Sequence, residues 1–345
     1  MTSSKHADAM AAARDIGRLN TAYTQAKVLH SAVELGLFET LAAGPATVDT
    51  LCQRLRLHPR LAPDFLGALV GLGLLEYTEG QYRNSHAAQV LLVPGGPLSM
   101  NGSVVQHGRV HYGLWSSLTE ALRDGRAKSG PQTPAGAVTD EQPDLETARA
   151  FMAHMDTFNS IVAPELARSV DWSRHRTFVD VGGARGNLAG LLVKAHPHLQ
   201  GSVFDVPGLE PLFDEHMAGL RTRDKVSFQG GDFFSDPLPE ADVVIFGHVL
   251  HDWPEQARRT LLERAFPAVR PGGVLLVYDA MIADGSFDAH AHLQSLICSL
   301  IRDGGSEYSE SSCREWAEKA GFRVKDVIPL DTVTNDRLLV AVKDA

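Results

Sequence analysis

The spacing of hydrophobic residues changes from a helical to a strand-like pattern about half-way along the chain. Between residues 10 and 43, apolar positions recur at helical spacing, as in AYTQAKVLHSAVELGLFETL, which predicts amphipathic helix. The Gly and Pro of the following AAGP end this pattern. Beyond residue 170, short apolar runs alternate with helical stretches. The chain therefore begins with a helical region and ends with an α/β region.

A winged-helix-like order follows the first helical segment. TVDTLCQRL predicts a helix with Thr47 as its cap, RLAPDFLGALVGLGLL a second helix, and EYTEGQYRNS a hairpin-like pair around Gly80. Residues 101–128 predict more helix, 129–146 a connection punctuated by Pro and Gly, and 145–170 a further helix. An apolar helix in a winged-helix outline is expected to pack against another subunit or to cover a neighbouring pocket.

The second half predicts a parallel sheet. The expected strands are TFVDVG, SVFDV, VSFQGG, DVVIFGHV, VLLVYDAM, VKDVIPL and RLLVAVKD, with helices between the first five. Apolar strands that alternate with helices indicate a doubly wound, Rossmann-like α/β sheet. The last two strands leave no room for a crossover helix, so we expect an antiparallel hairpin at one edge. We predict a winged-helix-like dimerisation domain over residues 1–100, a helical connector over 101–170, and the α/β sheet domain over 171–345.

Composition and charge narrow the classes of protein. Of the 345 residues, 44% are hydrophobic and 21% charged, which is typical of globular proteins. The excess of 42 Asp and Glu over 32 Lys and Arg disfavours nucleic-acid or anionic-membrane partners. The three cysteines are widely spaced, so neither a disulfide framework nor a zinc knuckle is expected. No signal peptide or long apolar span is visible, and we predict a cytoplasmic location.

Three successive strand ends carry residues suited to binding adenosine. In FVDVGGARGN, a strand ending at Asp180 is followed by a glycine-rich turn and the N-terminus of a helix. Glycine lets a ligand approach the backbone closely, and a helix N-terminus favours negative charge. The next strand ends in Asp205, which can accept both ribose hydroxyls, and the third in Asp232 and Phe233, suited to an adenine amine and ring. Alternatively, the two aspartates only cap the helices that follow. The glycines of the turn are Gly182, Gly183 and Gly186.

As a set, the motifs resemble those of class I S-adenosylmethionine-dependent O-methyltransferases, of the plant caffeate/isoflavone type and its bacterial antibiotic-pathway branch. The motifs are ELGLFETL, LVGLGLLE, VDVGGARG, GDFFSDPLPEADV, HVLHDW and GGSEYSE. The resemblance implies a homodimeric enzyme of secondary metabolism with the seven-stranded methyltransferase sheet. It implies that S-adenosyl-L-methionine binds with its methionine end at the glycine turn of Gly182, Gly183 and Gly186, its ribose on Asp205 and its adenine at Asp232 and Phe233.

The chain departs from this family at two positions near the expected cofactor. Ala184 replaces a third adjacent glycine, and Gly247 stands where plant members have a lysine close to the cofactor. Either His248 or a water molecule is then expected to make the cofactor contact that the lysine makes in plant members. Trp253 either borders adenine or belongs to the core.

His251 in FGHVLHDWPE follows the fourth strand, at the sheet edge where ligands bind in such folds. A phenol has a pKa of about 10 and needs a base to accept its proton as it is methylated. The resemblance assigns that base to His251, oriented by Glu307 of GGSE and by Asp279, which replaces the usual glutamate and could instead reach through water or contact the substrate. A metal is not expected, because no third ligand follows His248 and His251 at helical spacing.

The helix ARAFMAHMDTFNSIV places aromatic and sulfur side chains on one stripe, which on its own indicates core. The resemblance implies that the stripe clamps the acceptor ring, so both interpretations can hold. Polar neighbours of the stripe, and Asp252, could bind polar groups of an acceptor such as free L-tyrosine or a natural-product precursor. The substrate-binding residues that we predict are Phe151, His154, Met155, Phe158, Asn159 and Asp252.

The sequence analysis leads to a metal-independent O-methyltransferase acting on a phenolic hydroxyl of a small aromatic acceptor. One alternative is a ligand-sensing regulator whose winged-helix-like region binds DNA, although that region has no basic helix. A second alternative is an NAD-dependent dehydrogenase. The Asp180 before the glycines, the GDFF motif and the terminal hairpin argue against it.

Overall fold

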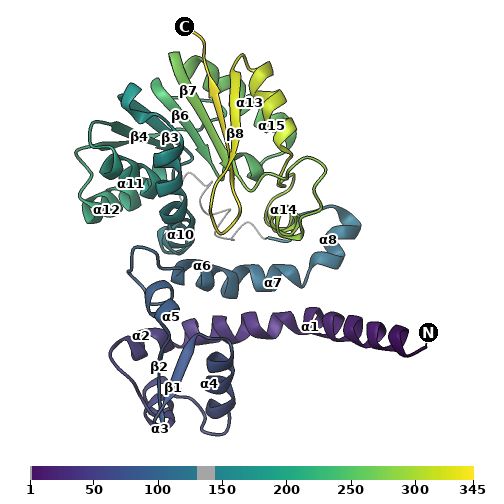
Figure 1. Cartoon of the computed structure of the whole chain (residues 1–345). Helices are drawn as coiled ribbons and strands as arrows, with labels where there is room; N and C mark the ends of the chain where they lie inside the picture. Colours follow the sequence, from purple (N-terminus) through teal and green to yellow (C-terminus); the bar gives the residue numbers. More distant parts are fainter. Residues whose placement is uncertain (1, 130–143) are drawn as a thin grey trace. The chain divides into compact units, whose positions relative to one another are not determined.

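The computed structural model describes residues 2–129 and 144–345. The chain forms two compact units, which divide between Arg109 and Val110 (Figure 1). Almost all of the predicted Pro- and Gly-punctuated connection lies outside the described residues.

The first unit is mostly helical and contains one β-hairpin, as predicted. The side chain of Thr47 accepts a hydrogen bond from the backbone N–H of Thr50, and so caps its helix. Glu79 and Gly80 both have positive φ angles, which form the two-residue turn of the hairpin. The elements are α1 (Thr2–Glu34), α2 (Leu37–Ala42), α3 (Val48–Leu55), α4 (Ala62–Gly71), β1 (Leu75–Thr78), β2 (Gln81–Asn84), α5 (His86–Leu91) and α6 (Asn101–Gln106).

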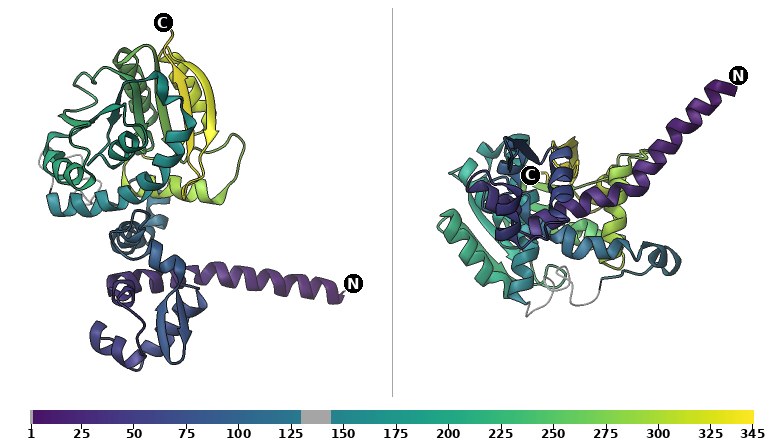
Figure 2. Two further views of the ribbon diagram at one scale, coloured as in Figure 1. Left: turned by 60° about the vertical axis from the view of Figure 1, so that its left-hand side comes forward. Right: turned by 90° about the horizontal axis from the view of Figure 1, so that it is seen from below.

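Helix α1 has a long stretch that the first unit does not cover. Residues 8–27 are all exposed, whereas the C-terminal end of the helix joins the core around Phe38 and Leu66. Figure 2 shows the N-terminal part of α1 extending beyond the other elements of its unit. Ile16, Leu19 and Tyr23 are 60–79% exposed. An apolar stretch of this kind is a surface for association.

The second unit opens with helices and continues with seven strands. A π-helical turn (His107–His111) crosses the boundary between the units. The predicted helix over residues 145–170 is confirmed as α10 (Leu145–Ser169). The other helices are α7 (Tyr112–Trp115), α8 (Leu118–Asp124), α11 (Asn187–Ala195), α12 (Glu210–Leu220), α13 (Glu255–Ala268), α14 (Ala289–Ile301) and α15 (Glu310–Lys319), with 3₁₀ turns η2 (Trp172–Arg174), η3 (Pro207–Leu209) and η4 (Leu250–Asp252).

The seven strands form one sheet in the order β5-β4-β3-β6-β7-β9-β8. The first five are parallel, and β9 pairs antiparallel with both β7 and β8. The predicted antiparallel pair at one edge is confirmed, with β8 outermost. The strands are β3 (Thr177–Val181), β4 (Gln200–Asp205), β5 (Val226–Gly230), β6 (Ala241–Gly247), β7 (Val269–Asp279), β8 (Arg323–Pro329) and β9 (Arg337–Val342).

One predicted crossover helix is absent. Residues 231–240 between β5 and β6 form turns and extended chain, so the prediction of a helix between each of the first five strands was wrong there. The segment GDFFSDPLPE contains two prolines, which remove backbone donors and restrict the preceding residues. Ten residues of this composition do not sustain a helix.

Helices cover both faces of the sheet, as the doubly wound prediction requires. Alternate residues of β6 point to opposite faces: Val243 and Ile245 pack with α10, α11 and α12, whereas Val244 and Phe246 pack with α13 and α15. The carboxyl ends of the parallel strands meet at one edge, which carries the predicted site. None of the helices in the described parts of the chain is long and apolar enough to cross a membrane.

Candidate active site

The turn after β3 is built from residues in left-handed or crowded conformations. Gly182 has φ 74°, and a Cβ there would lie 2.7 Å from Cγ2 of Val249. A Cβ on Gly183 would lie 2.5 Å from Oδ2 of Asp180. Ala184, at the position that departs from the resembled family, still takes φ 51°, and its N–H donates to Asp205 Oδ2 at 2.8 Å. Ala184 therefore adopts a left-handed conformation, which glycine takes up readily.

Asp205 at the end of β4 is buried and accepts two backbone hydrogen bonds. The second comes from the N–H of Val206 to Oδ1 at 2.7 Å. Burial raises the pKa of Asp205 to about 6, although the two backbone donors oppose this shift. Each carboxylate oxygen keeps a lone pair for one more donor. Such an acid suits the paired hydroxyls of a ribose. Their hydrogen bonds would replace those from water that the carboxylate loses on burial.

The acid and aromatic residues after β5 have local partners of their own. Asp232 accepts from the N–H of Phe234 and from the hydroxyl of Ser235, each at 2.9 Å, so it caps a turn and not the helix that the alternative interpretation expected. The side chain of Phe233 is partly exposed and lies edge-on to Trp253, with ring centroids 5.8 Å apart. Trp253 therefore borders Phe233 and also packs against the core.

Two residues of the glycine turn have structural reasons to be there. Gly186 has φ 80° and begins α11, where a Cβ would lie 2.9 Å from the ring of Phe213. The helix therefore needs glycine for packing. Arg185 forms a partly buried ion pair with Asp156 of α10. This pair joins the glycine turn to the helix that carries the predicted acceptor stripe.

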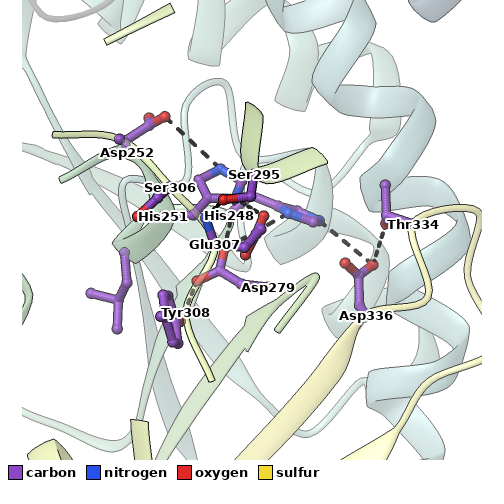
Figure 3. A network of polar contacts seen from close by, with 12 residues as sticks. His248, His251, Asp252, Asp279, Ser295, Ser306, Glu307, Tyr308, Thr334 and Asp336 are labelled. Atoms are coloured by element: carbon purple, nitrogen blue, oxygen red, sulfur yellow. Dashed lines mark hydrogen bonds and ion pairs between the residues drawn. The ribbon is translucent and has the colours of Figure 1, made fainter. Parts of the chain in front are cut away.

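His251 lies in η4 beside two buried carboxylates (Figure 3). Its Nδ1 lies 2.8 Å from Oε1 of Glu307 and 3.3 Å from Oδ1 of Asp279. The imidazole is 17% exposed, whereas the two carboxylate side chains are 1% and 0% exposed. With Nδ1–H donating to Glu307, the lone pair of Nε2 is left to accept a proton. The structure thus brings together the three residues predicted as catalytic.

Asp279 contacts the imidazole directly, which answers whether the shorter side chain needs a bridging water. Its other oxygen accepts a hydrogen bond from the hydroxyl of Tyr308 at 2.5 Å. Burial raises the pKa of Asp279 to about 8, and Glu307 adds to this shift while His251 opposes it. The sequence analysis did not identify Tyr308 as a partner, although the residue lies next to the GGSE motif.

The surroundings of His251 favour its protonated form. Burial alone would lower the pKa of His251, but Cys298, Asp279 and Glu307 act in the opposite direction and raise the pKa well above its usual range. Burial also raises the pKa of the Cys298 thiol. The thiol is therefore neutral near neutral pH, and the two carboxyl groups beside Nδ1 favour the imidazolium when they are ionised.

Glu307→Gln is expected to change the pH dependence of the reaction. The substitution keeps the side-chain shape but removes a charge that stabilises the imidazolium, so the pKa of His251 falls. A base acts in its neutral form, which then persists to lower pH. We expect the acidic limb of the kcat/KM profile to move to lower pH while the maximal rate declines. Glu315→Gln, an exposed charge removal, is the control; an acidic limb that stays in place would contradict this role for Glu307.

His248 lies in the same polar network as His251. It is buried at φ 54°, with Nδ1 3.9 Å from Asp279 Oδ1 and Nε2 3.7 Å from Asp336 Oδ2 (Figure 3). Burial lowers the pKa of His248, in spite of the nearby acids. Gly247 beside it has no space for a side chain, since a Cβ would lie 2.1 Å from the ring of Tyr278. That packing explains why a lysine is not accommodated here.

Arg258 of α13 forms hydrogen bonds with both segments that carry the site, the one around His251 and the one around Glu307. The sequence alone did not identify this residue. It donates to the backbone carbonyls of Leu250 and Trp253 on either side of His251, and to that of Ser306 beside Glu307. The arginine is 4% exposed. A charged residue on the buried side of an amphipathic helix is the signal that could have found it.

Arg258→Lys is expected to lower both stability and turnover. Lysine cannot reproduce the planar fork, so buried carbonyls lose their donor, at roughly 1–3 kcal/mol of unfolding free energy for each one left unpaired. Denaturant unfolding and kcat are the measurements. Arg259→Lys is the matched control, because that arginine is partly exposed and pairs with Glu255. Equal effects of the two substitutions would contradict the fastening role.

The predicted acceptor stripe on α10 is not core. Phe151, Met155 and Phe158 are each partly exposed, whereas Met152 on the adjoining face is fully buried. Phe158 reaches toward His248, with ring centroids 6.1 Å apart.

The polar neighbours of the stripe have protein partners. His154 is buried and packs edge-on against Phe158 at 4.9 Å. Asn159 accepts a hydrogen bond from the hydroxyl of Tyr278 at 3.4 Å. Asp252 lies 3.9 Å from Nε2 of His251 and is about one-third exposed. Of these polar residues, Asp252 lies nearest to the imidazole nitrogen that is left for the substrate.

Two groups of possible metal donors occur among the described residues. One is His248, His251 and Asp279, and the other is His251, Cys298 and Glu307; within each group the donor atoms lie within 4.8 Å of one another. The sequence analysis looked for a third ligand at helical spacing. The additional donors come instead from β7, α14 and the loop after α14, which are distant in sequence.

A glycine turn, a buried acid suited to ribose hydroxyls and a histidine lie at the carboxyl edge of a seven-stranded sheet. This fold and site define a class of protein, the S-adenosylmethionine-dependent methyltransferases. Within this class the chain belongs to the O-methyltransferase family. The model of the O-methyltransferase domain matches residues 115–323, and that of the O-methyltransferase dimerisation domain matches residues 18–94. The cofactor prediction is confirmed, as is the prediction of an enzyme.

Individual relatives agree with this assignment. The chain is 50% identical over 335 residues, or 97% of each protein, to the N,N-dimethyltransferase OxyT of Streptomyces rimosus. It is 46% identical over 310 residues to the tetracenomycin polyketide synthesis 8-O-methyl transferase TcmO of Streptomyces glaucescens, covering 89% of this chain and 91% of TcmO. The crystal structure of human N-acetylserotonin methyltransferase with S-adenosylmethionine has a TM-score of 0.85 at 28% identity, covering 97% of this chain and 98% of that one.

Proposed function

We propose that this enzyme methylates a phenolic hydroxyl of a small aromatic natural-product precursor, with His251 as the general base. The observation that carries the proposal is the short contact of His251 Nδ1 with Glu307, which leaves Nε2 to accept the phenol proton. The name of the relative TcmO, an 8-O-methyl transferase of polyketide synthesis, supports an aromatic alcohol as acceptor. The proposed reaction uses no metal.

In the proposed mechanism, bound S-adenosylmethionine supplies a methyl group on a positively charged sulfur. Asp205 accepts hydrogen bonds from the ribose, Asp232 and Phe233 hold the adenine, and the Gly182–Gly183 turn leaves room for the methionine end. Phe151, Met155 and Phe158 of α10 hold the aromatic ring of the acceptor.

His251 withdraws the hydroxyl proton as the oxygen attacks, and Glu307 and Asp279 stabilise the imidazolium that forms. Because these acids raise the pKa of His251, the imidazole becomes a stronger base. His248 helps to shape the pocket beside Phe158. The first unit is proposed to form a homodimer through exposed α1 rather than to bind DNA, which agrees with its match to a dimerisation model.

N-methylation of an amine is a second candidate function. It is favoured by one specific observation, the 50% identity to the N,N-dimethyltransferase OxyT over nearly the whole chain. A neutral amine already presents a lone pair, so it needs no base before attack, and a base only removes the proton afterwards.

The test is a panel of acceptors with purified enzyme and S-adenosylmethionine. Matched polycyclic aromatics with either a hydroxyl or an amino group, together with free L-tyrosine, are followed by mass spectrometry for the gain of one or two CH₂ units. Fragmentation assigns the methyl to oxygen or nitrogen. Methylation of the hydroxyl compounds alone supports the proposal. Methylation of the amines alone contradicts it and supports the second candidate.

A further inference from the structure

His251 has more potential ligands around it than a general base requires. One carboxylate suffices to orient a catalytic imidazole. Here two carboxylates contact Nδ1, and the thiol of Cys298 belongs to the same cluster, in which one donor atom each from His251, Cys298 and Glu307 lies within 4.8 Å of the others. Imidazole, thiolate and carboxylate together are the ligand types that bind Zn²⁺.

We propose that His251, Cys298 and Glu307 form a Zn²⁺-binding site, and that occupation of this site inhibits the enzyme. A second observation points to a ligand there. Oε2 of Glu307 is buried without a hydrogen-bond partner, on a side chain that is 1% exposed. Asp279 Oδ1, 3.3 Å from His251 Nδ1, is likewise buried without a hydrogen bond.

The donors are held in place by the surrounding chain. Cys298 and Ser295 lie on α14, and the N–H of Glu307 donates to the hydroxyl of Ser295 at 3.1 Å. The hydroxyl of Ser299 donates to the carbonyl of Gly305 at 2.7 Å, which ties the loop carrying Glu307 to the same helix. Tetrahedral Zn²⁺ bonds of about 2.0–2.3 Å require donors roughly 3.3–3.8 Å apart, so the cluster needs shifts of about 1 Å. The partly exposed imidazole provides the entry path.

Zn²⁺ at this site would remove the base whichever ring nitrogen it binds. On Nδ1 it selects the neutral tautomer whose single ring proton is on Nε2, so the lone pair needed there is lost. On Nε2 it occupies that lone pair directly. Binding also releases the thiol proton of Cys298, because the thiolate is the form that ligates metal. The inhibition rests on the proposed role of His251, whereas the binding of the metal does not.

The experiment combines a direct binding measurement with inhibition. Co²⁺ is titrated into the wild type, Cys298→Ser and Cys52→Ser, and the charge-transfer absorption of a Co²⁺–thiolate bond is recorded. Zn²⁺ is then titrated into turnover assays of the same proteins, with reversal by a chelator. Cys52 lies in the first unit and controls for thiol number. Cys298→Ala serves as a second variant if the serine protein does not fold.

We expect the absorption band in the wild type and in Cys52→Ser and its loss in Cys298→Ser, with at least about tenfold more Zn²⁺ needed to inhibit the last. Absence of the band from the wild type, or equal inhibition of all three proteins, would overturn the proposal. The two proposals fail separately. If the wild type shows the band and His251→Ala keeps full activity, the base assignment is refuted but Cys298 remains a metal ligand. If the wild type shows no band and His251→Ala is inactive, only the metal site is refuted.

Discussion

His251→Ala is expected to lower kcat for a phenolic acceptor by about 10²–10⁴-fold, the usual contribution of a general base. The substitution removes the imidazole, whose Nε2 accepts the hydroxyl proton in the proposed mechanism. The two acids beside Nδ1 stabilise the cation that results. The residues proposed to bind the cofactor lie at other strand ends, so the dissociation constant for S-adenosylhomocysteine should stay within about threefold of the wild type. Steady-state kinetics and calorimetry measure the two quantities.

The comparison with other variants and acceptors makes this prediction specific. His292→Ala changes an exposed histidine on α14 and should leave kcat unaltered. With an amine acceptor, the loss in His251→Ala should be much smaller, because the amine attacks through its own lone pair. A phenol turned over at the wild-type rate by His251→Ala would refute the base assignment.

Asp205→Ala is expected to weaken cofactor binding by about 10–100-fold, the equivalent of one charge-assisted hydrogen bond. The substitution removes the acceptor proposed for the ribose hydroxyls. It also leaves the N–H groups of Ala184 and Val206 without their partner, which loosens the glycine turn. Calorimetric titration with S-adenosylhomocysteine gives the dissociation constant directly.

The pH dependence of binding provides an independent check on Asp205. Its pKa, raised to about 6 by burial, lies above the usual range. The ionised form is the better acceptor, so affinity should fall as the pH drops through about 6 and hold steady above it. Asp214→Ala, an exposed acid paired with Arg223, should keep the wild-type profile. Unchanged affinity in Asp205→Ala would exclude the acid from the ribose site.

The connection between β5 and β6, which contains no helix, shows where sequence patterns misled. A strand-helix alternation was extended to every connection, although GDFFSDPLPE has prolines that resist it. Asp232 shows a different limit, because its residue type fits both a turn cap and an adenine contact, and the structure shows the cap. In contrast, the apolar run of β6 was sufficient to predict a buried strand. Its alternate residues pack into the cores on the two opposite faces of the sheet.

The sequence by itself determined the helical first region, the seven strands, the edge hairpin and the strand ends that carry Asp205 and His251. These follow from local periodicity and from the rule that parallel strands end at one edge. Only the tertiary structure decided that Asp279 contacts His251 directly, that Arg258 fastens the site, and that Cys298 lies beside the base. Those contacts join residues that are far apart in sequence, and their distances depend on how helices pack on the sheet, which no local pattern records.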